Sequence, residues 1–143
     1  MLTVNDILQG KSINTIFSIE PGNTVYEALK IMGEKNIGAL VVMEGDELKG
    51  ILSERDYARK VALKDRKSKE TLVSEIMTEK VITVSPTDSV EFCMTTMSDK
   101  KIRHLPVTEN GKVAGIISIG DVVTAIINTQ QETINHLQNY ISQ

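Results

Sequence analysis

The chain has 143 residues and a formal net charge of −3, which suits one compact domain or two half-size units that share a core. Only 3% of the residues are aromatic and none is tryptophan, so the sequence offers neither the basic surface nor the stacking platform for polymeric nucleic acid. No apolar run approaches the roughly 18 residues of a membrane span and the first residues lack a secretory signal, so we expect a cytoplasmic protein without a membrane segment.

The first half of the chain predicts five elements from the spacing of its apolar residues and its turns. In chain order these are a strand, a helix, the two strands of a hairpin and a closing helix, at 16–19, 24–36, 39–43, 48–52 and 57–63. We expect the first helix to begin at Thr24, which stands three residues before Glu27 in the spacing of a capping box. The turn at 44–46 joins the hairpin strands.

The two halves are copies of one another. A shift of 65 residues, without a gap, superposes identical residues along a whole folding unit. The matching pairs include Pro21 and Pro86, Met32 and Met97, Gly50 and Gly115, Ser53 and Ser118, and Asp56 and Asp121. The sequence therefore predicts an α/β fold of tandem βαββα units at 1–64 and 73–127, joined by an exposed, charged linker at 65–72.

The second copy has the stronger hairpin turn, Asn110-Gly111, and its closing helix is expected at 122–127. Beyond it, a C-terminal amphipathic helix is predicted over 128–143. Its narrow apolar stripe consists of Ile134, Leu137 and Ile141. Such a stripe needs a partner helix, in the same chain or in a second copy.

Both copies place a hydroxyl and a carboxylate where the last hairpin strand turns into a helix. The residues are Ser53 with Asp56, and Ser118 with Asp121. The free backbone N–H groups of a helix N-terminus favour an anionic ligand, and the carboxylate can accept hydrogen bonds from ribose hydroxyls. The alternative is that each serine is only a helix cap. Because the pair occurs twice, we favour a shared nucleoside-binding function.

These segments resemble the motif of the tandem CBS-domain (cystathionine β-synthase domain) family, in which a hairpin ends in Gly, an apolar residue, and a Ser or Thr three residues before Asp. The resemblance covers about residues 1–127; it is full at 101–107 and 115–121, and weaker at 36–42. It implies a pseudo-two-fold CBS pair whose sheets pack together. Between the units it implies two clefts that commonly take AMP, ADP, ATP or a related adenine compound.

By this resemblance, Asp121 would bind ribose hydroxyls in one cleft, with Ser118 and Arg103 near the phosphate. The full set for this cleft is Asn14, Ile37, Gly38, Arg103, His104, Ile116, Ser118, Gly120 and Asp121. The glycine would let the backbone approach the base, and the two isoleucines would sandwich it. His104 is more simply a strand-start histidine packed against the sheet than a catalytic or phosphate-binding group.

The resemblance places the second cleft at Asp56. Its set is Ile51, Ser53, Arg55, Asp56, Thr78, Glu79 and Ile102. Here Gly38 takes the position that Arg103 has in the other copy, so a cation must come from elsewhere, and Arg55 or Arg59 could supply it. Both arginines have the alternative role of solvated helix residues. We therefore expect the Asp121 cleft to bind nucleotide more tightly.

The sequence favours regulation over catalysis. No ligand-forming residues stand at metal-site spacing around His104, and His136 is distant in the sequence. The single cysteine, Cys93, falls in a helical pattern and is expected to be a buried apolar side chain rather than a reactive thiol. We recognise neither a glycine-rich phosphate loop with lysine nor a nucleophile with its base. We expect no enzyme and no metal.

The expected function is a homodimeric sensor that takes AMP or ATP as ligand and acts on an unknown downstream protein. A sensor of NAD(H) or S-adenosylmethionine is one alternative. A structural dimerisation module with vestigial clefts is another, and the Ser and Asp pair in both copies argues against it.

Overall fold

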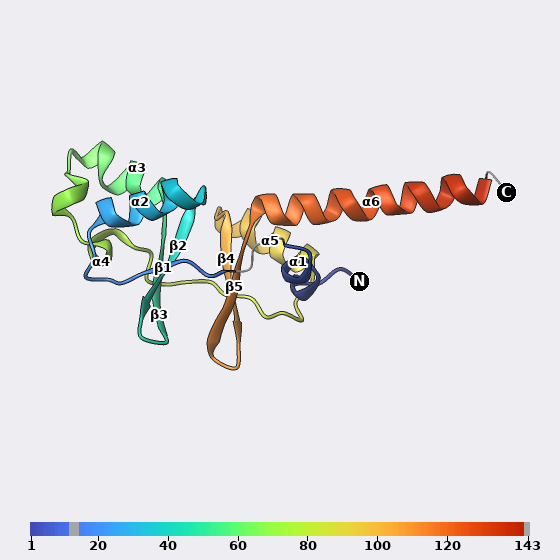
Figure 1. Cartoon of the computed structure of the whole chain (residues 1–143), viewed down its shortest axis with the longest axis horizontal. Helices are drawn as coiled ribbons and strands as arrows, with labels where there is room; N and C mark the ends of the chain where they lie inside the picture. The colour runs from blue at the N-terminus through green and yellow to red at the C-terminus, as the bar shows by residue number, and fades with distance from the viewer. Residues whose placement is uncertain (12–14, 142–143) are drawn as a thin grey trace.

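Two α/β halves stand side by side in the computed structural model, which describes residues 1–11 and 15–141, and one long helix projects beyond them (Figure 1). The elements are α1 (Val4–Gly10), β1 (Ser18–Ile19), α2 (Val25–Lys35), β2 (Ala39–Glu44), β3 (Glu47–Ser53), α3 (Glu54–Lys60), α4 (Val73–Ile76), α5 (Val90–Lys100), β4 (His104–Glu109), β5 (Lys112–Ser118) and α6 (Ile119–Ile141). Short 3-10 helices lie at Ala62–Lys64 and Ser68–Glu70. The mixed α/β class and the C-terminal helix expected from the sequence are confirmed.

In the first half, β1, β2 and β3 form one sheet in that order, with β2 and β3 as the antiparallel hairpin. β1 pairs parallel to β2 over only Ser18–Ile19, so it is shorter than the strand expected at 16–19. The Thr24 hydroxyl accepts a hydrogen bond from the Glu27 backbone N–H at 3.2 Å, and α2 begins where the capping spacing predicts. It ends at Asn36, in the left-handed conformation with φ 55°.

In the second half, β4 and β5 form the predicted hairpin. Asn110 and Gly111 have φ of 54° and 79°, the positive values that a two-residue hairpin turn of this hand requires. The strand that the repeat predicts before α5 is reduced to one isolated bridge, in which Val84 pairs parallel to Val107. The β-strand content of the two copies is therefore unequal.

Each half has its own core. The first contains Ile19, Val25, Ala28, Met32, Leu40, Val42, Leu52, Val61, Val73 and Ile76. The second contains Val4, Ile7, Val84, Val90, Cys93, Met97, Leu105, Val107, Ile117 and Val122. Burial raises the pKa of the Cys93 thiol, in agreement with the expected apolar role. The packing crosses the boundaries expected from the sequence, because α1 enters the second core and α4 enters the first.

Backbone hydrogen bonds hold α1 and α4, each of which packs in the core of the other half, in place. The Val4 N–H donates to the Asp88 carbonyl at 2.9 Å, so α1 is joined to the start of α5. The Val73 N–H donates to the Asn23 carbonyl at 2.8 Å, and this joins α4 to the start of α2. α1 is capped by a full box of Thr3 and Asp6. The sequence contains this capping signal, and Val4, Ile7 and Leu8 stand at helical spacing, so α1 was predictable although no helix was expected there.

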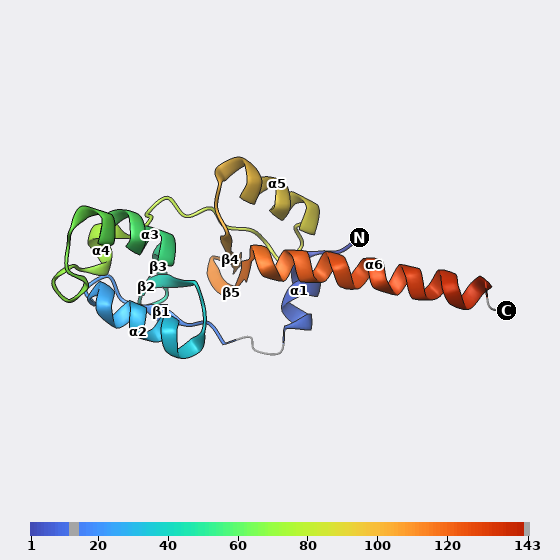
Figure 2. The same cartoon turned by 90° about the horizontal axis from the view of Figure 1, so that it is seen from above.

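α6 joins two helices that were expected separately, because it runs without a break from Ile119 to Ile141. Its first turns lie between α1 and α5 (Figure 2). Its second half projects past the body of the molecule, and Ile134, Leu137 and Ile141 are 47%, 58% and 80% exposed. Among the described residues, no helix is both long and apolar enough to span a membrane.

Candidate functional site

Two cavities, each lined by residues of both halves, contain the two motif carboxylates. The larger has a volume of about 790 Å³ and includes Asp121, and we name it the Asp121 cleft. The smaller has a volume of about 510 Å³ and includes Asp56, and we name it the Asp56 cleft. Both volumes fall within the ordinary range of small-molecule sites, roughly 300–1,000 Å³.

The hydroxyl and carboxylate of each motif form a reciprocal cap at the start of a helix. The Asp121 N–H donates to Ser118 Oγ at 3.1 Å, and the Ser118 N–H donates to Asp121 Oδ2 at 2.9 Å. In the first copy the Asp56 N–H donates to Ser53 Oγ at 3.2 Å, and the Ser53 N–H donates to Asp56 Oδ2 at 3.0 Å. The capping interpretation is therefore confirmed in both copies, and it does not exclude a binding role, because each carboxylate has a second oxygen.

A lysine that was not among the expected site residues contacts each motif carboxylate. Lys11 Nζ lies 3.1 Å from Asp121 Oδ2 and donates to the Ile116 carbonyl at 3.0 Å. Lys60 Nζ lies 3.3 Å from Asp56 Oδ1 and donates to a backbone carbonyl of α4. Lys60 is four residues after Asp56 on one helix, a spacing that the sequence alone could have revealed. Lys11 is 110 residues from Asp121, so no local pattern indicates that pair.

The two carboxylates differ in how many further hydrogen bonds they can accept. Asp56 Oδ1 is contacted by Lys60 and, at 3.5 Å, by the Thr78 hydroxyl. In the part of the chain that the structure describes, Asp121 Oδ1 has no hydrogen-bond or ion-pair partner. A ribose hydroxyl can therefore bond to Asp121 without breaking an existing contact.

Gly38 and His104 line both clefts and so form part of the wall between them. A Cβ on Gly38 would lie 3.5 Å from His104 Cε1 and 3.4 Å from Glu54 Oε1, which shows how closely the backbone faces these side chains. His104 is the first residue of β4 and is partly buried, as the sequence indicated. Burial lowers its pKa, and the nearby Asp121 charge opposes that shift in part. The imidazole is therefore held toward its neutral form.

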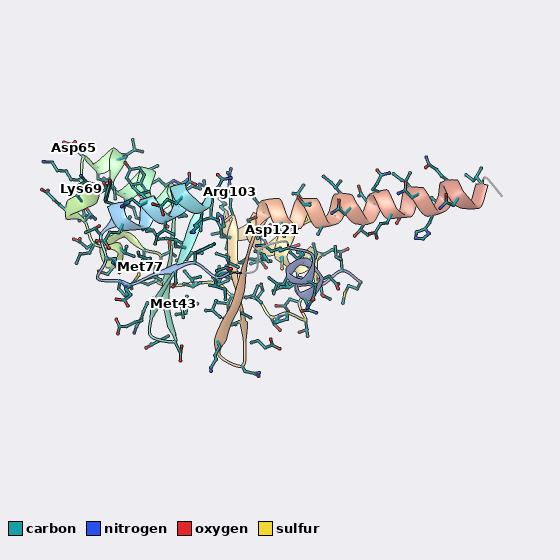
Figure 3. The ribbon with its side chains drawn as sticks, viewed as in Figure 1. Met43, Asp65, Lys69, Met77, Arg103 and Asp121 are labelled. Atoms are coloured by element: carbon teal, nitrogen blue, oxygen red, sulfur yellow. The ribbon has the colours of Figure 1, made fainter. Side chains whose placement is uncertain are left out.

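Arg103 lies in a different cleft from the one expected. It lines the Asp56 cleft and is absent from the lining of the Asp121 cleft. Figure 3 labels both residues, with Asp121 in the first turn of α6 and Arg103 toward the first half. The pseudo-symmetry gives the reason, since a shift of 65 residues relates positions in opposite clefts. Ile37 and Ile102 are such a pair, since Ile37 lines the Asp121 cleft and Ile102 lines the Asp56 cleft. Arg103 is the equivalent of Gly38.

The other residues expected from the sequence divide as follows. In the Asp121 cleft the lining contains Ile37, Gly38, His104, Ile116, Ser118 and Asp121. In the Asp56 cleft it contains Ile51, Ser53, Arg55, Asp56, Arg59, Thr78 and Ile102. Gly120 and the exposed Glu79 are in neither lining, whereas Lys80, the neighbour of Glu79 in the sequence, lines the Asp56 cleft. Asn14 lies outside the described residues.

The described residues contain no group of three or more histidine, cysteine or acidic side chains that could hold a metal ion. The geometry of both clefts suits recognition of a small polar ligand by hydrogen bonds and charge, beside apolar walls that can cover a flat base.

Comparison with known proteins gives a consistent family match. A family model described as "CBS domain" matches residues 4–63 and again 73–128. The chain is 42% identical over 147 residues to the Arabidopsis thaliana protein "CBS domain-containing protein CBSX3, mitochondrial", and the match covers 97% of this chain and 71% of that protein.

Two solved structures extend the match to the fold. A protein with CBS domains from Burkholderia ambifaria MC40-6 is 51% identical with a TM-score of 0.86, over 90% of this chain and 96% of that one. The CBS domain pair of protein MJ0100, in complex with 5′-methylthioadenosine and S-adenosyl-L-methionine, is 27% identical with a TM-score of 0.79, over 90% of this chain and 98% of that one.

Proposed function

The chain belongs to the CBS-domain family, and we propose that it is a regulatory module that binds adenine nucleotides of the AMP, ADP and ATP class in its two clefts. The observation that carries this proposal is the Asp121 carboxylate, which lines the cleft and is fixed through its Oδ2 by Ser118 and Lys11, while its Oδ1 has no partner among the described residues. Vicinal ribose hydroxyls are the donors that such a fixed carboxylate recognises.

Adenosine recognition is supported by the shape and lining of the Asp121 cleft. Ile37 and Ile116 both line it, and their apolar side chains suit the two faces of an adenine ring. Gly38 lines the same cleft, and a residue without a side chain lets the backbone come close to the edge of a base. These residues do not identify the group attached to the ribose, so S-adenosylmethionine and NAD(H) are the competing ligands.

Thermal unfolding with each ligand tests the proposal directly. A ligand that binds only the folded state stabilises it by about 2.7 kcal/mol at a hundredfold excess over Kd. We expect adenosine, AMP, ADP or ATP to raise the Tm, and Asp121→Asn to weaken at least one of these effects. An unchanged Tm with all four and a rise with S-adenosylmethionine or NAD(H) would identify a different sensor. No rise with any ligand would favour a structural module with vestigial clefts.

Regulation in place of catalysis is part of the same proposal. Binding regulates only if the ligand prefers one arrangement of the two halves, or one assembly, over another. To test for catalysis, bound ATP is followed over hours by chromatography. We expect it to be recovered unchanged, and steady conversion would contradict the proposal. A downstream protein that reads the ligand state, and a cytoplasmic location, remain proposals from the sequence.

A homodimer is supported by the apolar side chains that this chain leaves exposed. On α5, Phe92 and Met94 are 52% and 40% exposed, and the projecting part of α6 exposes its stripe of isoleucine and leucine. A second copy would cover both surfaces, and closed two-fold dimers are the commonest way to do so. Light scattering at micromolar concentration should give twice the mass of one chain. A monomer, or a larger closed ring, would contradict this part of the proposal.

A further inference from the structure

We infer that the two clefts select their ligands by charge: the Asp56 cleft takes a polyphosphate nucleotide such as ATP, and the Asp121 cleft takes an adenosine compound with little or no phosphate. This inference rests on the proposed function and goes beyond it, because it assigns a different ligand class to each cleft. It is carried by the charged side chains that line them.

The Asp56 cleft is strongly basic. Among the described residues that line it, six are basic and two, Glu54 and Asp56, are acidic. The basic residues are Arg55, Arg59, Lys80, Lys100, Lys101 and Arg103. Within the described ranges, 1–11 and 15–141, none of the six forms an ion pair. Unpaired cations of one sign around a concave surface focus the field and attract an anion of high charge.

The Asp121 cleft has the opposite balance. Its lining contains two lysines, against the three acids Asp6, Asp121 and Glu132. Both lysines already have partners, since Lys11 is paired with Asp121 at 3.1 Å and Lys35 Nζ lies 5.4 Å from the centroid of the Phe17 ring. This cleft therefore has no uncommitted cation in its described lining. A triphosphate placed there would face net negative charge, whereas an uncharged adenosine would not.

The contrast arises at equivalent positions of the repeat. Asn36 and Lys101 both end a helix with φ 55°, and they line opposite clefts. Gly38 and Arg103 are a second equivalent pair, in which Gly38 lines both clefts without a side chain and Arg103 lines only the Asp56 cleft. The backbone of the two copies is the same at the helix ends, so the side chains create the charge difference. Arg supplies a planar set of donors that suits phosphate oxygens.

The test is calorimetric titration with adenosine, AMP, ADP and ATP at constant ionic strength. The first variant is Arg59→Gln combined with Arg103→Gln, which removes two cations from the Asp56 cleft and changes side chains alone. Its matched control is Lys30→Gln combined with Lys112→Gln, which removes the same charge from positions outside both clefts. The second variant is Asp121→Asn. Thermal unfolding without ligand checks that each variant folds.

We expect the double arginine variant to bind ATP at least about a hundredfold more weakly and adenosine unchanged, because each of the two lost charge-assisted contacts costs about tenfold or more. We expect the control to bind ATP within about twofold of the original protein, and Asp121→Asn to weaken adenosine much more than ATP. ATP affinity that is unchanged in the arginine variant would overturn the inference, and so would equal losses of ATP and adenosine in Asp121→Asn. Either result would leave nucleotide binding intact, whereas failure of the original protein to bind any of the four would overturn the proposed function as well.

Discussion

Replacing Val4 by alanine should destabilise the fold strongly, although Val4 lies close to the start of the chain. The side chain is 0% exposed and belongs to the second core, beside Val90 and Leu105. The substitution removes two buried carbon atoms, worth about 1.6 kcal/mol by transfer, and leaves a cavity, so we expect a loss of about 2–3 kcal/mol. Urea unfolding followed by circular dichroism measures this loss.

Two companion variants make the experiment decisive. Val73→Ala is the matched change in α4, where the side chain is also 0% exposed but belongs to the first core, and it should have a similar effect. Leu63→Ala, at a side chain that is 78% exposed, should change stability by less than about 0.5 kcal/mol. If Val4→Ala behaved like Leu63→Ala, α1 would not be held in the second core, and the exchange of helices between the cores would be refuted.

Two further predictions concern the protonation of His104 and the close packing at Gly50 and Gly115. The pKa of His104 is lowered in the folded state, so the unfolded chain binds more protons below its ordinary pKa of about 6.5. Stability should therefore fall as the pH drops from about 7.5 to about 5.5, and His104→Gln should reduce that fall in urea midpoints; an equal fall in both proteins would contradict this. Gly50→Ala would place a Cβ 2.8 Å from the Thr78 carbonyl oxygen, and we expect a loss of about 1–3 kcal/mol. Gly115→Ala would meet only the flexible end of Leu8 at 2.9 Å and should lose less in the same assay, so equal losses would count against the close approach of the Thr78 backbone to Gly50.

Local patterns made much of this fold predictable. Thr24 and Glu27 fixed the start of α2, and Asn110-Gly111 fixed the second hairpin, because capping and tight turns depend on residues close in sequence. The Ser and Asp pairs were also predictable as a motif, and both line the clefts to which they were assigned. The unequal strands before α2 and α5 were not, since pairing of such short segments depends on the tertiary fold.

Contacts between distant segments were the part that the sequence did not reveal. The packing of α1 in the second core and of α4 in the first joins segments that are far apart in the sequence, and the backbone hydrogen bonds that accompany it carry little sequence signature. The pair of Lys11 and Asp121 depends on the same docking of α1. The assignment of Arg103 to the Asp121 cleft failed for a different reason. The repeat itself indicates the cleft that Arg103 lines. In a pseudo-two-fold pair, the equivalent of a residue in one cleft lies in the other.

This symmetry would allow one repeated backbone to bind the two ligand classes that we propose. The paired motif residues Ser53 and Ser118 cap equivalent helices, so both clefts keep the same carboxylate at the same point of the fold. The residues at 36 and 38 and their equivalents at 101 and 103 line the clefts outside both cores, where a change of side chain leaves the Ser–Asp caps and the cores in place. Charge at these positions can therefore differ between the clefts at little expense to stability. A protein arranged in this way can read the phosphate charge of one ligand independently of the nucleoside that occupies the other cleft, provided that the two sites remain separate across Gly38 and His104.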